Sequence, residues 1–469
     1  MRLDLTEGSP FKLILKFSLP ILIGNIFQQL YNMADTIIVG HTVSSDAMSG
    51  VGCTSSISFL ILGLVWGLTS GFGVRTSQFF GARDENGLRR SIAVSFELCL
   101  VMTALLTAIS VPLAGPLLKA MNTPESYYEY AYYYLVTIFW GIGATILYNI
   151  AANTLRAVGD SRTPLFCLVF SAVLNVILDF VCIVGFDMTY IGAGFATVVS
   201  QFISGAVCIA YMFKAYPALR LHKSDWKIDL NMIKGHIYVG LPMALQFSIT
   251  AVGCIFQQTA LNGLNSSMPG VVTGYTAATK IDNIANQTFN SLGTACATYA
   301  GQNYGAKKFD RIKDGVFASM VYCIISWGLG LAFCLGLGVP MTGLFLNGAS
   351  GEAAAYYSEM INYSMEFLIY QSIFYPCLGI IFIYRNTLQG IGKSAVTTIA
   401  GVTELAGRSV TAFILVKYIG YVGVCLSNPI AWVAADIFLL ATYYITMRKY
   451  KEKGEYGIKS LLLRKKQLN

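Results

Sequence analysis

Residues 18–40 read SLPILIGNIFQQLYNMADTIIVG and contain one carboxylate, that of Asp35. The stretch is long and apolar enough to cross a bilayer as an α-helix, which needs about 20 such residues. An Asp at the centre of a membrane helix costs roughly 2.5–3.5 kcal/mol even on insertion scales, and acidic residues within membranes are functional as a rule. The stretch therefore predicts a membrane helix in which Asp35 is a candidate functional residue.

The rest of the chain has the composition of a membrane protein. Of its 469 residues, 55% are hydrophobic and 12% are charged, whereas soluble domains carry about 25% charged residues. The N-terminal segment lacks the early apolar region and the cleavage site of a secretory signal peptide. Apolar runs recur along the whole length and predict twelve membrane-spanning helices near 14–39, 47–73, 90–115, 130–152, 163–185, 190–213, 236–262, 269–299, 315–338, 357–383, 394–418 and 421–447.

Lys and Arg residues are concentrated on one predicted side of the membrane. With the N-terminus inside, 28 of the 32 fall in ends and loops on that side, including Arg385 in the loop after the tenth span. Lys119 and Lys417 fall outside, and Lys280 and Arg408 fall within spans. Because cytoplasmic loops carry such an excess, we expect both termini in the cytoplasm of a bacterial inner-membrane protein. The net charge of +8 thus reflects membrane orientation, and we expect no nucleic-acid partner.

The sequence repeats itself. SQFFGARDENGLRRS (77–91) returns as GQNYGAKKFDRIKDG (301–315), and TLRAVGDSRTP (154–164) returns as TLQGIGKSAVT (387–397). The repeat predicts two six-helix lobes of the same orientation, related by a pseudo-twofold axis along the membrane normal; such repeats are typical of secondary transporters. The expected divisions are a first lobe, a cytoplasmic linker, a second lobe and a basic cytoplasmic tail, at 1–213, 214–234, 235–447 and 448–469.

The two halves differ in their buried polar residues. At the repeat offsets of 222 and 233 residues, Asp35 corresponds to Gln257, Asn175 to Arg408 and Asp179 to Ala412. Carboxylates in the first half thus correspond to neutral or basic positions in the second. Asp35, Asp179 and Thr197 each lie five or six residues from the outer end of their predicted helix, about 7–10 Å deep at ~1.5 Å per residue.

Asn175 and Asp179 are four residues apart and share one face of a predicted helix. With Asp35 and Thr197 they form a set of oxygen ligands, which hard cations prefer, so the metal ion that the set would bind is Na⁺. Two neighbouring carboxylates can instead share a proton, because burial and a like charge both raise a carboxyl pKa. A purely structural hydrogen bond is the third interpretation.

The chain resembles the multidrug and toxic compound extrusion (MATE) transporters over nearly its full length. The motifs that carry the resemblance are LTEGSPFKLILKFSLPILIGNIFQQLYNMADTIIVG, QFFGARDENGLRRS, TLRAVGDSRTP, NVILDF, GAGFATVVSQ and GQNYGAKKFDRIKDG. The resemblance implies a V-shaped pair of six-helix lobes and export of lipophilic organic cations against inward Na⁺ or H⁺ flow by alternating access. It also implies a cation-coupling site at Asp35, Asn175, Asp179 and Thr197, and a helix bend at Pro20, where proline removes a backbone hydrogen bond. A static kink at Pro20 is the alternative.

The second half departs from some branches of that family, which carry a Glu where this chain has Thr250. It offers instead a set of candidate polar and ion-pair residues, of which Glu404 and Arg408 are four residues apart and can pair along one helix. The set comprises Gln257, Lys280, Asp282, Glu404 and Arg408.

Other function classes find less support. The chain has no metalloprotease or hydrolase motif, and the GIGKS at 390–394 lacks both the first glycine and the preceding strand of a phosphate loop. We therefore expect no enzyme, no cofactor beyond the coupling ion, and a monomer in the lipid bilayer. The alternative function is a lipid-linked oligosaccharide flippase of the same wider superfamily, but those proteins generally have more spans and cationic cavities.

Overall fold

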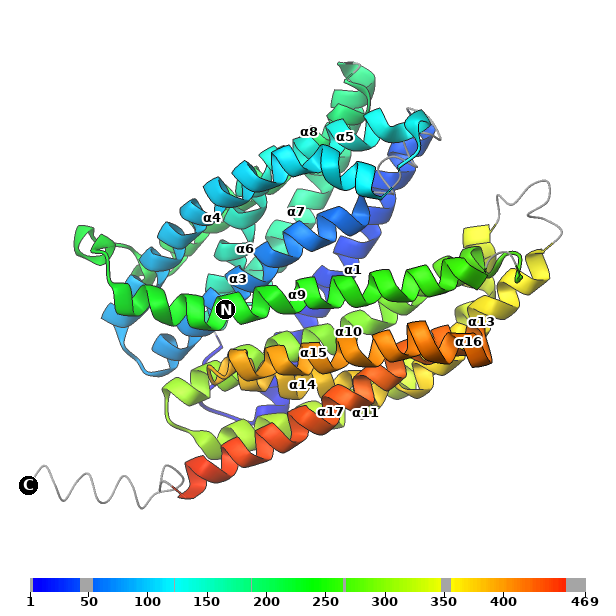
Figure 1. The fold of residues 1–469 in the computed structure, drawn as a ribbon. Helices are drawn as coiled ribbons and strands as arrows, with labels where there is room; N and C mark the ends of the chain where they lie inside the picture. Colours follow the sequence, from blue (N-terminus) through cyan, green and yellow to red (C-terminus); the bar gives the residue numbers. More distant parts are fainter. Residues whose placement is uncertain are drawn as a thin grey trace, which may run out of the picture. The chain divides into compact units, whose positions relative to one another are not determined.

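The computed structural model describes residues 3–42, 54–121, 123–186, 188–264, 267–346 and 356–452, except for the side chains of 31–42 and of 127, 184, 189, 190 and 452. The described part of the first half folds into helices joined by short connections (Figure 1). Its helices are α1 (Pro10–Thr42), α3 (Ser55–Gly81), α4 (Glu85–Ala120), α5 (Glu125–Trp140), α6 (Ile142–Ala157), α7 (Arg162–Asp179), the π-helical η1 (Phe180–Gly185) and α8 (Thr189–Ala215).

The second half repeats this order. Two short 3₁₀ helices, η2 (Pro217–Leu219) and η3 (Lys223–Trp226), lead into it. Its helices are α9 (Leu230–Leu264), α10 (Val271–Gly305), α11 (Phe309–Leu346), α13 (Tyr357–Ile373), α14 (Tyr375–Gly390), α15 (Ser394–Val410), the π-helical η4 (Thr411–Leu415), α16 (Val416–Ile419) and α17 (Tyr421–Glu452).

The described residues contain nine segments long and apolar enough to cross a membrane, and two bent helix pairs raise the number to eleven. The remaining long helix, α10, has 35 residues but a polar sequence with several Asn, Gln and Thr. The protein is therefore an all-helical membrane protein with eleven or twelve spans, as predicted.

The fourth span of each half is broken, whereas the sequence predicted one helix in each place. α5 and α6 meet at 48°, and α13 and α14 meet at 50°. Gly141 lies at the first break, where a Cβ atom would come within 2.0 Å of Val198 Cγ2 on α8. Phe374 lies at the second break, and Pro376 follows it in the first turn of α14, where its missing N–H is tolerated.

Most helices extend beyond their apolar runs. α3 ends at Gly81 instead of the predicted 73, because the helix continues through the polar sequence RTSQ; its predicted start at 47 lies outside the described residues. Hydropathy locates the part of a helix that lies in lipid, whereas the backbone hydrogen bonds continue until a cap or a turn ends them.

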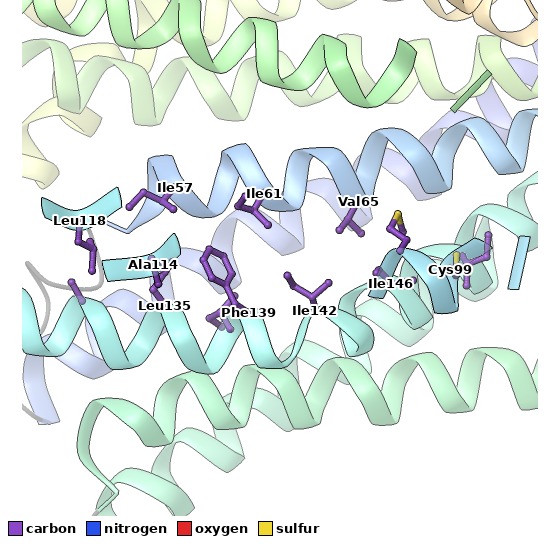
Figure 2. Packing of buried hydrophobic residues seen from close by; sticks show 14 of the residues in the cluster. Ile57, Ile61, Val65, Cys99, Ala114, Leu118, Leu135, Phe139, Ile142 and Ile146 are labelled. Carbon is purple, nitrogen blue, oxygen red and sulfur yellow. The ribbon is translucent and has the colours of Figure 1, made fainter. Parts of the chain in front are cut away.

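The chain packs into two compact units. Unit 1 comprises Met1–Glu7, Lys16–Ser248 and Gly301–Ala306, and unit 2 comprises Gly8–Leu15, Ile249–Ala300 and Lys307–Asn469. In unit 1, side chains of α3, α4, α5 and α6 form one apolar core (Figure 2). Ile61, Val65, Phe139 and Ile142 lie within it, each at most 8% exposed. The division of the sequence at 214–234 stays a prediction.

The predicted linker lies against α4 within unit 1. Asp225 lies 3.5 Å from Arg89 Nε, and Asp229 lies 2.8 Å from Arg90 Nη2. Both arginines belong to the first turns of α4, which Asp84 caps by accepting a hydrogen bond from Gly87 N at 2.9 Å. Charge pairing therefore holds a segment that its composition alone would leave as a solvated loop.

Residues 3–7, which we call the N-terminal strap, cross the end of unit 1. Leu3 N donates to Gly159 O at 3.1 Å. Leu5 N donates to Gln302 Oε1 at 3.0 Å, and Asn303 Nδ2 donates back to Leu5 O at 3.1 Å. Leu5 is 1% exposed. The strap thus ties the loop after α6 to Gln302 and Asn303 in the last turn of α10.

Candidate ion-coupling site

Asn175 and Asp179 occupy the buried face of α7. Both side chains are fully buried, whereas Val173 and Ile177 on the opposite face are 56% and 55% exposed. The helical period explains the division, because residues four apart face the same way and residues two apart face opposite ways. In a membrane helix the exposed apolar face contacts lipid, so the two polar residues face the interior of unit 1.

α8 brings Thr197 to the same place. Asn175 Nδ2 donates to Thr197 Oγ1 at 3.3 Å, and Thr197 Oγ1 donates to Ala193 O at 3.0 Å. Among the described residues, Asn175 Oδ1 is buried without a hydrogen-bond partner. A buried acceptor in that condition requires a water, an ion or another donor. Beside this amide oxygen lie the threonine hydroxyl and, one helical turn along α7, the Asp179 carboxylate, all of them oxygen groups of the kind that ligate hard cations.

The helix changes its winding directly after Asp179. The π-helical segment η1 begins at Phe180, and π-helical turns inside α-helices are frequent at functional sites. Sequence periodicity gave no sign of this segment. The π-helical segment begins at the residue directly after the buried carboxylate.

Two predicted site residues lie on α1. Asp35 falls within the helix, but its side chain lies outside the described residues, so its participation stays a prediction. Pro20 is buried within α1, which continues as one helical element on both sides of it. The bend predicted at Pro20 likewise stays a prediction.

Unit 2 contains a buried group of arginines and one glutamate. Glu404 forms an ion pair with Arg385 Nη2, and its second oxygen lies 3.9 Å from Arg408 Nη2, one turn away on α15. All three side chains are 5–6% exposed. Arg385 was predicted in a cytoplasmic loop, and this was wrong: it is buried in α14, five residues before the GIGKS loop. Its position directly after the apolar run IIFIY could have indicated burial.

The other predicted residues of the second half are dispersed. Gln257 Nε2 donates to Val424 O of α17 at 3.2 Å. Asp282 is buried on α10, where Tyr375 Oη and Asn286 Nδ2 each donate to it at 2.8 Å. Lys280, two residues away, is exposed. Sequence reasoning missed Tyr375 and Asn286, although Asn286 follows Asp282 by one helical turn.

The described residues contain no group of three or more His, Cys, Asp or Glu side chains that could hold a metal ion. A site built from Asn175, Asp179 and Thr197 is of another type, with amide and hydroxyl oxygens beside one carboxylate. Such a site suits a weakly held monovalent cation better than a tightly bound transition metal.

Comparison with known proteins supplies the family. Residues 20–181 and 242–414 match the MatE family. The chain is 28% identical over 391 residues to the probable multidrug resistance protein YpnP of Bacillus subtilis, covering 83% of this chain and 84% of that protein. It is 23% identical to the multidrug export protein MepA of Staphylococcus aureus, covering 91% and 92%.

A solved structure of an outward-facing multidrug resistance MATE family transporter superposes with a TM-score of 0.88 at 22% identity, covering 96% of this chain and 98% of that one. That likeness shows a shared fold. The family match covers both halves and includes Asn175, Asp179 and Arg408. The chain belongs to the MatE family of membrane transporters.

Proposed function

We propose that the protein is a secondary active multidrug exporter that moves lipophilic organic cations out of the cell against an inward flow of Na⁺ or H⁺. The observation that carries the proposal is the buried pair Asn175 and Asp179, joined to Thr197 across α7 and α8. The names of YpnP and MepA, as a multidrug resistance protein and a multidrug export protein, support the substrate class.

The mechanism requires an ion that binds one conformation better than the other, because a ligand with equal affinity for both states shifts nothing. Unit 1 supplies the residues for such binding. The α7 sequence has no Lys or Arg beyond Arg162 at its start, and a buried ionised carboxylate is costly unless a cation or hydrogen-bond donors accompany it. An exchangeable ion between α1, α7 and α8 meets that need, and Asp35 is the expected second carboxylate.

The charge distribution supports an orientation with both termini in the cytoplasm, and we expect the protein to act as a monomer. Cysteine probes at Ser45, Asn265 and Ser350 are then expected to react from outside, whereas probes at Asp84 and Lys308 are not. The first three positions lie outside the described residues. Labelling of the Asp84 probe in intact cells would contradict this orientation.

The test uses purified protein in liposomes loaded with a lipophilic fluorescent cation. A Na⁺ gradient is imposed at fixed pH, and a pH gradient is imposed separately without Na⁺. We expect one of the two to drive uphill transport and Asp35→Asn to abolish it, because the neutral side chain mimics a permanently protonated one. Asp310→Asn, which changes an exposed carboxylate on α11, is the control. Undiminished gradient-driven transport by Asp35→Asn, or transport of anionic compounds alone, would refute the proposal.

A further inference from the structure

The part of unit 2 that corresponds to the candidate ion site consists of α9, α15 and α17. In the sequence repeat, Gln257 corresponds to Asp35 and Arg408 corresponds to Asn175. The structure agrees with this correspondence in two ways. A π-helical segment follows α15 as another follows α7, and Gln257 on α9 bonds to Val424 on α17. The same three-helix arrangement thus exists in both halves with different residues inside it.

Arg408 extends its side chain into this arrangement. It is 6% exposed, and it passes so close to α9 that a Cβ atom at Gly253 would lie 2.9 Å from its Cδ and 3.1 Å from its Nη1. Gly253 precedes Gln257 by one helical turn. The absence of a side chain at 253 therefore makes room for a guanidinium at the level where the first half has its candidate ion site.

The guanidinium is only partly neutralised and only partly hydrogen-bonded. Within the described part of the chain, its nearest carboxylate oxygen is 3.9 Å away on Glu404, which forms a closer ion pair with Arg385. Among the described residues, Arg408 Nε and Nη1 are buried without hydrogen-bond partners. A buried ion pair made for stability is expected to satisfy these donors. Arg408 is therefore a buried charge whose hydrogen-bond donors are not all satisfied by the described residues.

A second carboxylate completes the charge balance of this region. Asp436 on α17 is 5% exposed and interacts electrostatically with Arg385. The cluster therefore contains two basic side chains, Arg385 and Arg408, and two acidic ones, Glu404 and Asp436. Without Arg408, the two acidic side chains share a single basic partner, and the space that the guanidinium leaves is next to the Glu404 carboxylate, which attracts a small cation.

We infer that Arg408 is a tethered cation that permanently occupies the second half's counterpart of the ion-coupling site. An ion that cannot leave cannot couple, so ion exchange is confined to the first half. Removal of the guanidinium opens a site for a small monovalent cation, namely Na⁺ or free guanidinium. The inference rests on the proposed function for the meaning of the first-half site, but its test does not use transport.

The experiment measures thermal unfolding of the purified full chain in detergent at fixed pH, in an Asp179→Asn background that removes one of the two candidate carboxylates of the first half. Arg408→Ala is compared with and without guanidinium chloride at a concentration too low to denature. We expect guanidinium to raise the melting temperature of Arg408→Ala by about 1 °C, the size expected for roughly 1 kcal/mol of binding energy in a chain of 469 residues, and to leave the background protein unchanged. Urea, a neutral molecule of the same shape, is the matched control and is expected to have no such effect.

Equal effects of guanidinium and urea, or no effect of either, would overturn the inference. Arg408→Lys keeps the charge and is expected to insert and melt within a few degrees of the background protein. If Arg408→Ala fails to insert, Arg408→Lys decides the question. Insertion as poor as that of Arg408→Ala would show that the shape of the guanidinium matters and its charge does not, and would overturn the inference. Because transport is measured in a separate experiment, a failure of the proposed transport function can be distinguished from a failure of this inference.

Discussion

The segments α7–η1 and α15–η4 share one backbone plan, an α-helix that runs directly into a π-helical turn. Their buried residues differ in charge. α7 carries an amide and a carboxylate and has no Lys or Arg in its sequence beyond Arg162, whereas α15 carries Glu404 and Arg408, with Arg385 from α14. A carboxylate that couples transport must exchange its bound ion, whereas a carboxylate paired with a fixed arginine keeps the same partner. The comparison teaches that a duplicated scaffold can keep its geometry while one copy acts as the ion site and the other becomes fixed in charge.

The largest expected effect is on transport by Asp179→Asn. The variant keeps the size of the side chain but removes the charge that would hold the ion, so we expect gradient-driven export to fall by at least about 100-fold while the protein still inserts and folds; the estimate assumes loss of the full ion-binding preference between states. Flux into liposomes, normalised to inserted protein, measures it. Near-normal flux would argue against a functional difference between α7–η1 and α15–η4.

The next effect is on stability, in the other half. Glu404→Gln leaves Arg385 and Arg408 buried with Asp436 as their remaining acid, and loss of one partner of a buried ion pair costs about 3–5 kcal/mol. We expect that decrease in the free energy of unfolding, measured by denaturation in mixed micelles. Glu359→Gln on the exposed part of α13 is the control. A decrease no larger than that of the control would mean that Glu404 is not the carboxylate that fixes the charge.

A smaller effect concerns the broken fourth spans. Gly141→Ala brings a methyl group to within 2.0 Å of Val198, and overpacking of this kind typically costs about 1–3 kcal/mol. Gly263→Ala in α9, where no atom lies within 4 Å of the added carbon, is expected to be neutral or slightly stabilising, by up to ~1 kcal/mol. Equal melting temperatures for the two variants would argue against close contact between the first break and α8.

The smallest effect is expected at Gln257, the counterpart of Asp35. Gln257→Ala removes one hydrogen bond to Val424 O, which contributes about 1 kcal/mol to stability. Transport is expected to stay at the wild-type rate, and Gln257→Glu is expected not to restore Asp35→Asn. Rescue by the glutamate would show that the two halves are interchangeable after all.

Much of this architecture follows from apolar runs and a repeat visible in the sequence. The buried face of α7 was predictable because Asn175 and Asp179 are four residues apart. The breaks at Gly141 and Phe374 were not, because they depend on contacts such as that with Val198, which no local pattern reveals. Arg385 was misplaced because a hydropathy pattern ends a span at the first charge, although a buried Glu404 can hold that charge inside.

The N-terminal strap has a practical consequence for handling the protein. Its buried Leu5 and the hydrogen bonds from Leu3 and Leu5 to Gly159 and Gln302 make this short segment part of the packing of unit 1. An affinity tag or fluorescent fusion placed directly ahead of Leu3 would compete with these contacts, whereas α17 ends in the exposed residues Arg448, Lys449 and Lys451. Reporters for folding and purification therefore belong after α17.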